Sequence, residues 1–316
     1  MIKKRHNNLK TVKKSSSPTQ IALQKFVKNK IAMASLIFLI LVAIISIIAP
    51  LLAPLPINQQ DLLNIKGDMT SQNLLGTDSG GRDNFSRLLY AGRVSLTIGL
   101  VSTIGMLVIG IAIGVISGYF GGLLDTLLMR ITEFVMLFPF LIFAIVLNAA
   151  LGDKIKNPYG SAIILVGVII ILSWGGIARL VRGKVMQEKE NEYFLAAKSI
   201  GTPTYKIILK HLLPNILSVV IVQATLTFAG MIVVESGLSF LGFGISKSIP
   251  SWGNMLSDAQ EGDIISSKPW IWMPPALMIM FTILSINFVG EGLKDAFNPK
   301  GRKWLNELVK KWDRIL

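Results

Sequence analysis

Few side chains in this sequence could carry out covalent or metal chemistry. The chain has 316 residues, no cysteine and two histidines, His6 and His211. Thiolate nucleophiles, iron–sulfur clusters and multi-histidine metal sites are therefore excluded. The closest approach to a phosphate-binding loop is RGKV (residues 182–185), which lacks the earlier glycine and the hydroxyl of that motif. We expect no catalytic residue, no bound cofactor, no metal and no enzyme activity in this chain.

Two polar residues inside apolar runs point to chemistry of another kind. Glu235 lies in GMIVVESGLSFLG, and Asn287 lies in a later apolar run. A carboxylate at membrane depth must be protonated, paired or hydrated by a cavity. We predict that both residues lie on a translocation pathway or at a gate. The alternative for Glu235, a place near the outer end where it reaches water, stays open.

The elements that would hold these residues are membrane helices. Apolar residues make up 52% of the chain and charged residues 16%, whereas a soluble domain has about 25% charged residues. A bilayer core needs about 20 apolar residues in a helix. Six stretches fit: residues 31–53, 95–118, 131–151, 161–178, 216–243 and 270–293. We predict an all-α integral membrane protein with six transmembrane helices, the first a permanent anchor because it is too long for a signal peptide.

Lysine and arginine are distributed unevenly between the connecting segments. Of the 32 such residues, 24 lie in alternate segments that include both termini, and 8 lie in the others. The positive-inside rule places the richer side in the cytoplasm, with both termini. The net charge of +14 is then a topology signal and an attraction to anionic lipid. We expect no nucleic-acid partner, because Phe26 is the only aromatic residue among the first thirty.

These patterns divide the chain into five parts. We predict a basic cytoplasmic tail with an amphipathic lead-in (1–30), a first transmembrane helix (31–54), an extracellular segment (55–94), a five-helix core (95–300) and a cytoplasmic C-terminal helix (301–316). The core contains the largest cytoplasmic loop, residues 182–215.

Small residues and proline mark the packing of two of the spans. Gly110, Gly114 and Gly118 recur every fourth residue, and such a face lets two membrane helices approach closely. Pro139, between two phenylalanines, should kink the third span because it removes a backbone hydrogen bond.

The extracellular segment contains a turn-rich cluster of charges. Asp78, Arg82 and Asp83 lie close together in LGTDSGGRD. They are candidates for an external docking surface. The alternative is a turn that satisfies its own charges through salt bridges.

The large cytoplasmic loop reads as a helix–turn–helix at the membrane surface. In ENEYFLAAKSIGTPTYKIILKHLLPN (190–215), Gly201 suits the position just past a helix end. Thr202 can cap a second helix with Pro203 in its first turn, and that helix should end near Pro214. Two adjacent alanines leave a bare patch that could seat in a groove of another protein, or the loop could be a plain connector.

The loop resembles the EAA loop, E-A-A-x3-G-x9-I-x-L-P, of permease subunits of binding-protein-dependent ABC importers. Leu195 stands at the usual glutamate and His211 at the isoleucine, and the other motif positions match. The resemblance implies that this loop couples the permease to an ATPase. The residues it implicates are Tyr193, Phe194, Leu195, Ala196, Ala197, Lys198, Gly201, Leu213 and Pro214.

Four further segments, in order, resemble the C-type permease of oligopeptide, dipeptide and nickel importers. They are LGTDSGGRDNFSRLLYAGRVSL (75–96), ESGLSFLGFG (235–244), PSWGNML (250–256) and GEGLKDAFNPK (290–300). The resemblance implies a type I ABC importer (MetI-like) permease fold in a bacterial plasma membrane.

The resemblance also implies partners. They are a second homologous permease, two ATPase subunits that hold ATP and Mg, and an extracellular substrate-binding protein, lipoprotein or periplasmic. Oligopeptides or dipeptides are the expected substrates, with nickel or a metal chelate as the alternative. Competing classes are a proton-driven secondary transporter with Glu235 as carrier, a scaffold protein and an ATP-driven exporter.

Overall fold

The chain is almost entirely helical. The computed structural model describes residues 18–151, 154, 157 and 159–297, and among these it contains no strand and a single isolated β-bridge, between Thr77 and Asp83. The helices, in chain order, are α1 (Pro18–Lys28), α2 (Lys30–Ile47), α3 (Ala49–Leu52), α4 (Asn84–Phe120), α5 (Gly122–Leu137), α6 (Phe140–Leu151), α7 (Gly160–Ser173), α8 (Gly175–Lys189), α9 (Glu192–Ser199), α10 (Thr204–Lys206), the π-helix η2 (Ile207–Leu212), α11 (Leu213–Phe240), α12 (Trp252–Leu256), the 3-10 helix η3 (Ser257–Gln260), α13 (Gly262–Ser267) and α14 (Pro269–Phe297).

Four continuous helical stretches are long and apolar enough to cross a bilayer. They are α2, α4, the stretch from α10 through η2 to α11, and α14. Two further pairs of helices are bent, α5 with α6 and α7 with α8, and the count is six if each pair is one span. In the most apolar window of α2 only 22% of the residues are buried, and its isoleucines are all exposed. Such a helix needs an apolar surrounding, so the fold is that of an integral membrane protein.

The two bent pairs have different causes. The axes of α5 and α6 differ by 77°, and the break is at Pro139, which lies between the two helices. This confirms the kink expected there and makes it a full interruption. The axes of α7 and α8 differ by 41° at Trp174, where the chain keeps a helical backbone without a proline.

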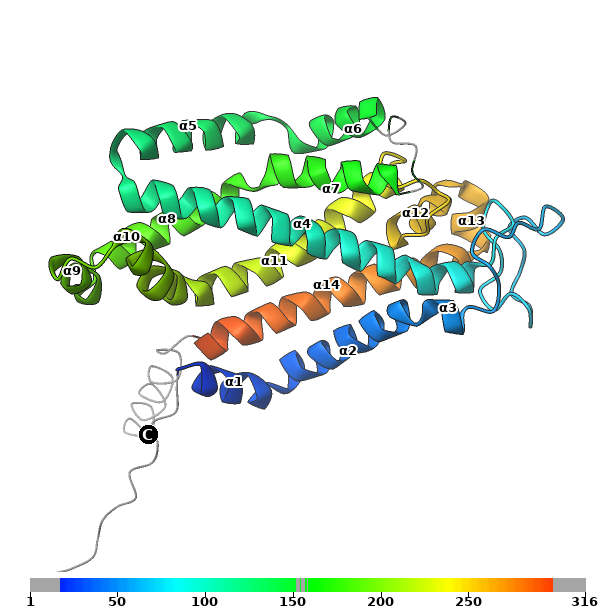
Figure 1. Cartoon of the computed structure of the whole chain (residues 1–316). Coiled ribbons are helices and arrows are strands. Elements are labelled where there is room, and N and C mark those ends of the chain that lie inside the picture. The colour runs from blue at the N-terminus through cyan, green and yellow to red at the C-terminus, as the bar shows by residue number, and fades with distance from the viewer. Residues whose placement is uncertain (1–17, 152–153, 155–156, 158, 298–316) are drawn as a thin grey trace, which may run out of the picture.

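The long helices lie side by side in one bundle (Figure 1). In packing order, α2 contacts α14, α14 contacts α11, α11 contacts α4, and α4 contacts α7 and α8, while α5 and α6 lie along the outside of α4, α7 and α8. The largest cluster of buried apolar side chains joins α4, α7, α8, α9 and α11.

The connecting segments gather at two opposite ends of the bundle. The outer end, as we call it below, holds residues 53–83, the end of α6, the start of α7, and α12 with α13 (Figure 1). The inner end holds α1, the join between α4 and α5, the segment from α9 to η2, and the end of α14. The lysine and arginine counts had already separated the same two groups of segments. The tail before residue 18 and the expected C-terminal helix (301–316) lie outside the described residues.

The glycine repeat lies where α4 crosses α8. A β-carbon on Gly110 would come within 2.7 Å of the Ile177 side chain, and one on Gly114 within 2.6 Å of the carbonyl oxygen of Ala178. Gly118 meets Val185 in the same way, at 2.8 Å. The absence of side chains on this face lets the two backbones touch.

The second span starts earlier than its apolar run suggests. Helix α4 begins at Asn84, and the side chain of Asp83 accepts a hydrogen bond from the backbone N–H of Ser86. Residues 84–94, expected to lie in the extracellular segment, are therefore the first turns of this helix. Apolar length did not predict this start, because the first turns of the helix contain polar residues.

Candidate functional site

The loop at the inner end is a short helix with one buried and one exposed side. Asn191 precedes the first residue of α9. The ring of Phe194 and the methyl group of Ala197 are buried in the main apolar cluster, with 3% and 5% of these residues exposed. Phe194 packs edge-on against Tyr119 at the end of α4, with ring centroids 6.1 Å apart. These contacts fix α9 to the bundle.

Glu188 and Lys189 hold the start of this loop. The hydroxyl of Tyr193 donates to Glu188 Oε2 (2.6 Å), and burial, together with this carboxylate, raises the pKa of Tyr193. Lys189 Nζ donates to the carbonyl oxygens of Gly118 (3.1 Å) and Tyr119 (2.8 Å). A lysine on the last carbonyls of a helix satisfies groups that the helix itself leaves open, so Lys189 ties the loop to the end of α4.

The other side of the loop is exposed and carries both large apolar side chains and lysines. Leu195 is 52% exposed and Ile200 82%, and Ala196, Lys198 and Gly201 are exposed as well. Two further exposed apolar side chains, Tyr205 and Leu209, follow in the second half of the loop and were not among the residues expected there. The repeat of large apolar residues in TYKIILKHLL was the signal for them, since a helix of that composition cannot bury every face.

Gly201 ends α9 in a left-handed conformation. Its φ is +73°, and its N–H donates to the carbonyl of Lys198. No heavy atom lies within 4 Å of the place where a β-carbon would stand. The glycine is therefore needed for its backbone conformation and not for space inside this chain.

The second half of the loop differs from the expected helix at both ends. Pro203 is the residue before the helix, which starts at Thr204, and no side chain caps it; the expected cap at Thr202 is wrong. The helix also does not end near Pro214. It continues through the π-helix η2 into α11, and the wider π turn relieves the clash that a proline causes with the preceding turn. Leu213 and Pro214 thus belong to the first turn of α11.

Arg182, from the partial phosphate-loop match, has a structural partner. Its Nε and one terminal nitrogen each donate to a different oxygen of Asp125, both at 2.6 Å. This two-point ion pair joins α8 to the start of α5 beside Ser117 of α4. The arginine is engaged in holding three helices together.

Glu235 is fully buried at the junction of three helices. Ser95 of α4 donates to Glu235 Oε2 (2.9 Å), and Ser239 donates to Oε1 (2.9 Å). The backbone N–H of Trp252 donates in turn to Ser95 Oγ (3.1 Å). The carboxylate has 0% exposure, so the alternative that it reaches water is wrong. It joins α4, α11 and α12, and a gating function for it stays a prediction. Asn287 is half-buried on α14 and is not part of this cluster.

The charged turn of the outer segment is folded inward. Asp78 and Asp83 are each 3% exposed. Asp78 Oδ2 pairs with Arg82 Nε at 2.8 Å and with Arg87 Nε at 3.4 Å. This geometry favours the salt-bridged turn. The docking surface formed by Asp78, Arg82 and Asp83 stays a prediction. The segment also exposes large apolar side chains, namely Leu62, Leu63, Ile65, Met69 and Leu74.

The turn is also linked to the later outer segment. Arg82 and Arg87 both donate to the carbonyl oxygen of Lys247, at 2.9 Å, and Ser79 donates to Asp258 (2.9 Å). Burial, and to a lesser extent the charge of Asp78, raises the pKa of Asp258. Residues 55–83 and 246–268 thus form one polar cap over the outer end.

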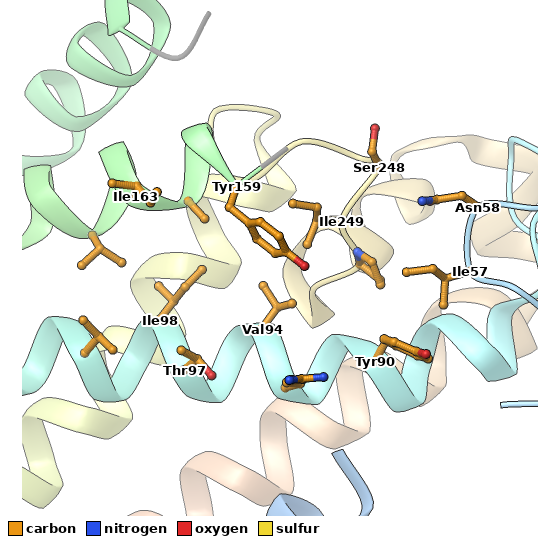
Figure 2. A pocket seen from close by; sticks show the side chains of 15 residues that line it. Ile57, Asn58, Tyr90, Val94, Thr97, Ile98, Tyr159, Ile163, Ser248 and Ile249 are labelled. Atoms are coloured by element: carbon orange, nitrogen blue, oxygen red, sulfur yellow. The ribbon is translucent and has the colours of Figure 1, made fainter. Parts of the chain in front are cut away.

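A cavity of about 760 Å³ lies beneath this cap. It is bounded by the first turns of α4, the start of α7 and residues 248–250 (Figure 2). Sequence reasoning did not find it, because its walls come from three segments far apart in the chain.

A helical bundle with outward apolar faces, a polar cap at one end and an exposed apolar loop at the other is the architecture of a multi-span membrane protein. Residues 110–303, more than half of the chain, match the family of binding-protein-dependent transport system inner membrane components. Residues 17–73 match the N-terminal transmembrane domain of oligopeptide transport permease C.

Curated relatives agree over nearly the full length. The chain is 38% identical over 284 residues to the dipeptide transport system permease protein DppC of Alkalihalophilus pseudofirmus, covering 90% of each chain. It is 37% identical over 300 residues to the oligopeptide transport system permease protein OppC of Lactococcus lactis, covering 93% of this chain and 97% of the relative. OppC of Escherichia coli is 38% identical over 285 residues, with 90% and 91% covered.

The chain therefore belongs to the family of inner-membrane permease components of binding-protein-dependent ABC transporters. The resemblance inferred from its motifs is confirmed. Members are transport components, and the family as a whole works with ATPases and binding proteins.

Proposed function

We propose that this chain is one of two permease subunits of an ATP-driven importer of oligopeptides or dipeptides in a bacterial plasma membrane. Its relatives are named for dipeptide and oligopeptide transport. In this proposal the chain crosses the membrane six times with both termini in the cytoplasm, and it forms half of the pathway. A second permease forms the other half, and a binding protein delivers the peptide at the outer end.

Coupling to ATP takes place at the inner end. The observation that carries this step is a pair of exposed apolar side chains in and just after α9, Leu195 and Ile200, both more than half exposed at the end richer in lysine and arginine. Exposed apolar patches mark protein contacts. Each of two ATPase subunits, which hold ATP and Mg, offers a groove, and α9 with Gly201 fills one of them. When the ATPases close, α9 moves with them and the spans shift between inward-facing and outward-facing states.

Gly201→Asp tests the proposal. The substitution puts a side chain on a left-handed backbone position and adds a charge where the ATPase would sit, so peptide uptake should fall to background while the protein stays in the membrane. Gly262→Asp is the matched control, because Gly262 is exposed, has open space around it and lies at the outer end. Uptake of a labelled dipeptide and the amount of membrane-inserted protein are measured in the same cells.

Normal uptake by Gly201→Asp would contradict the coupling step. Uptake that a proton ionophore abolishes at constant ATP would replace the importer with a proton-driven transporter. Uptake of nickel without uptake of peptide would keep the architecture and change the substrate.

A further inference from the structure

The cavity at the outer end has the size and place of a ligand site. Its volume of about 760 Å³ lies within the range of about 300–1,000 Å³ typical of small-molecule sites. It opens beneath the outer segment, from which Ile57 and Asn58 contribute to its rim (Figure 2). A substrate that arrives at the outer end meets this cavity before it meets the middle of the bundle.

The walls combine apolar surface with a few hydroxyl groups. On α4 the lining residues form two adjacent stripes at four-residue spacing, Tyr90–Val94–Ile98 and Arg93–Thr97–Val101. Figure 2 shows the ring of Tyr159 reaching from the start of α7 toward Val94, with Ile249 beside it. Apolar walls with a small number of polar groups are typical of sites that bind a ligand and fix its orientation.

Arg93 is the one charged residue among those that line the cavity. Within the described part of the chain its guanidinium has no ion pair and no hydrogen bond. The two other arginines near the start of α4 differ, because Asp78 and the Lys247 carbonyl engage Arg82 and Arg87. No acidic residue lines the cavity. Arg93 is exposed, so its guanidinium is free to pair with an anion that enters the cavity, and no residue that lines the cavity supplies one.

The cavity is accessible from one side. Tyr159 and Ile163 on α7 are 58% and 57% exposed, and Val101 on α4 is 45% exposed. A ligand can therefore enter without a rearrangement of the helices.

We propose that this cavity binds the C-terminal end of the transported peptide, with Arg93 pairing with the terminal carboxylate. The inference rests on the proposed function. Tyr90, Thr97 and Tyr159 also line the cavity, and their hydroxyls could hydrogen-bond the last peptide unit. The apolar stripe of Val94 and Ile98 accepts the last side chain with little selectivity. Every peptide has a terminal carboxylate, so one arginine serves substrates of any sequence. An anionic lipid headgroup offers similar chemistry and is the competing source of the anion.

Arg93→Gln and Arg93→Lys test the assignment in the full transporter, reconstituted with its partner permease, ATPases and binding protein in vesicles. Uptake is measured for one peptide with a free C-terminus and for the same peptide with an amidated C-terminus. The same binding-protein preparation serves all variants, so its own preference cancels in the comparison. Arg130→Gln is the matched control, because Arg130 is an exposed arginine on α5 that pairs with Glu133 away from the cavity.

Arg93→Gln should lower uptake of the free-carboxylate peptide about tenfold, the size expected for a lost charged hydrogen bond, and should leave uptake of the amidated peptide nearly unchanged. Arg93→Lys should keep most of the preference for the free carboxylate, and Arg130→Gln should match the wild type. Equal loss for both peptides, or no loss for either, would overturn the assignment.

A loss that follows the fraction of anionic lipid in the vesicles, whatever the peptide end, would assign the site to a lipid headgroup and also overturn it. If the wild-type transporter takes up neither peptide, the proposed function fails, and the inference with it.

Discussion

The outer and inner ends of the bundle are held together by different means. At the outer end, residues far apart in the chain are joined by polar contacts: Lys66 pairs with Glu261 at 2.5 Å and Asp263 at 2.9 Å, and Lys268 donates to the carbonyl of Lys66. At the inner end α9 is held by buried Phe194 and Ala197, and its own side chains form short-range hydrogen bonds, such as that of Ser199 to the Leu195 carbonyl.

In the proposed function this difference separates a scaffold from a moving part. A cap with many long-range hydrogen bonds and ion pairs opens only at a high free-energy cost. A short helix held by buried Phe194 and Ala197, with Lys189 bonded to the end of α4, can shift at a lower one. Both ends leave large apolar side chains exposed, among them Leu63 at the outer end and Ile200 in the inner loop. In the proposed function an ATPase subunit covers the inner loop.

The strongest test of the scaffold is Glu235→Ala. Removal of the carboxylate leaves the buried hydroxyls of Ser95 and Ser239 without their acceptor and creates a cavity, so we expect a loss of about 3 kcal/mol in the free energy of unfolding. The measurement is thermal unfolding of the purified protein in detergent, followed by tryptophan fluorescence. Glu235→Gln keeps the shape and one acceptor and should lose much less. An alanine variant as stable as the wild type would mean that the outer end does not depend on this junction.

A variant of the loop should show the opposite behaviour. Ile200→Ser changes a side chain that is 82% exposed, so stability should change by no more than about 0.5 kcal/mol. Co-purification with the ATPase subunits should fall about tenfold if Ile200 becomes buried against them. Leu23→Ser is the control, because Leu23 is 65% exposed on α1 at the same end but outside the loop. Equal losses in both variants would remove the distinction between the loop and its surroundings.

The smallest effect is expected for Lys66→Gln. This substitution removes the ion pairs of Lys66 with Glu261 and Asp263 in the cap, which we call the ionic clamp. Hydrogen bonds with Glu261 and Asp263 raise the pKa of Lys66 to about 12, and Lys66 lowers the pKa of Asp263. The clamp therefore stabilises the fold fully below the ordinary lysine pKa of 10.5 and loses this effect as pH rises through about 12. It also weakens as pH falls through the lowered pKa of Asp263. The groups are partly exposed, so the loss should be slight at pH 7 and should vanish in high salt.

The sequence predicted what depends on nearby residues. Apolar length located the long apolar helices, Pro139 marked the break between α5 and α6, and Gly201 marked the end of α9, because each of these effects acts within a few residues. The basic residues also divided the connecting segments into the two groups that the fold places at opposite ends.

What the sequence did not reveal depends on distant residues. The partners of Glu235 include Ser95, 140 residues away, and the cavity walls come from α4, α7 and residues 248–250. The ion pair between Asp78 and Arg87 was not predicted either, because it forms only once the cap is packed. The π turn in η2 was missed because its residues are ordinary helix formers, and the wider turn follows from the fit between the loop and Pro214.

The continuity of the inner loop with α11 makes this helix a lever. Residues 204–240 form a single helical stretch of 37 residues, roughly 55 Å long at 1.5 Å per residue. A tilt of about 5° around the inner end would carry the far end roughly 5 Å sideways over such a length. That far end holds Glu235 and, through Ser95, the N-terminus of α12. A small tilt on the basic side of the bundle would thus become a larger displacement at the Glu235 junction, because residues 204–240 are one continuous helical stretch.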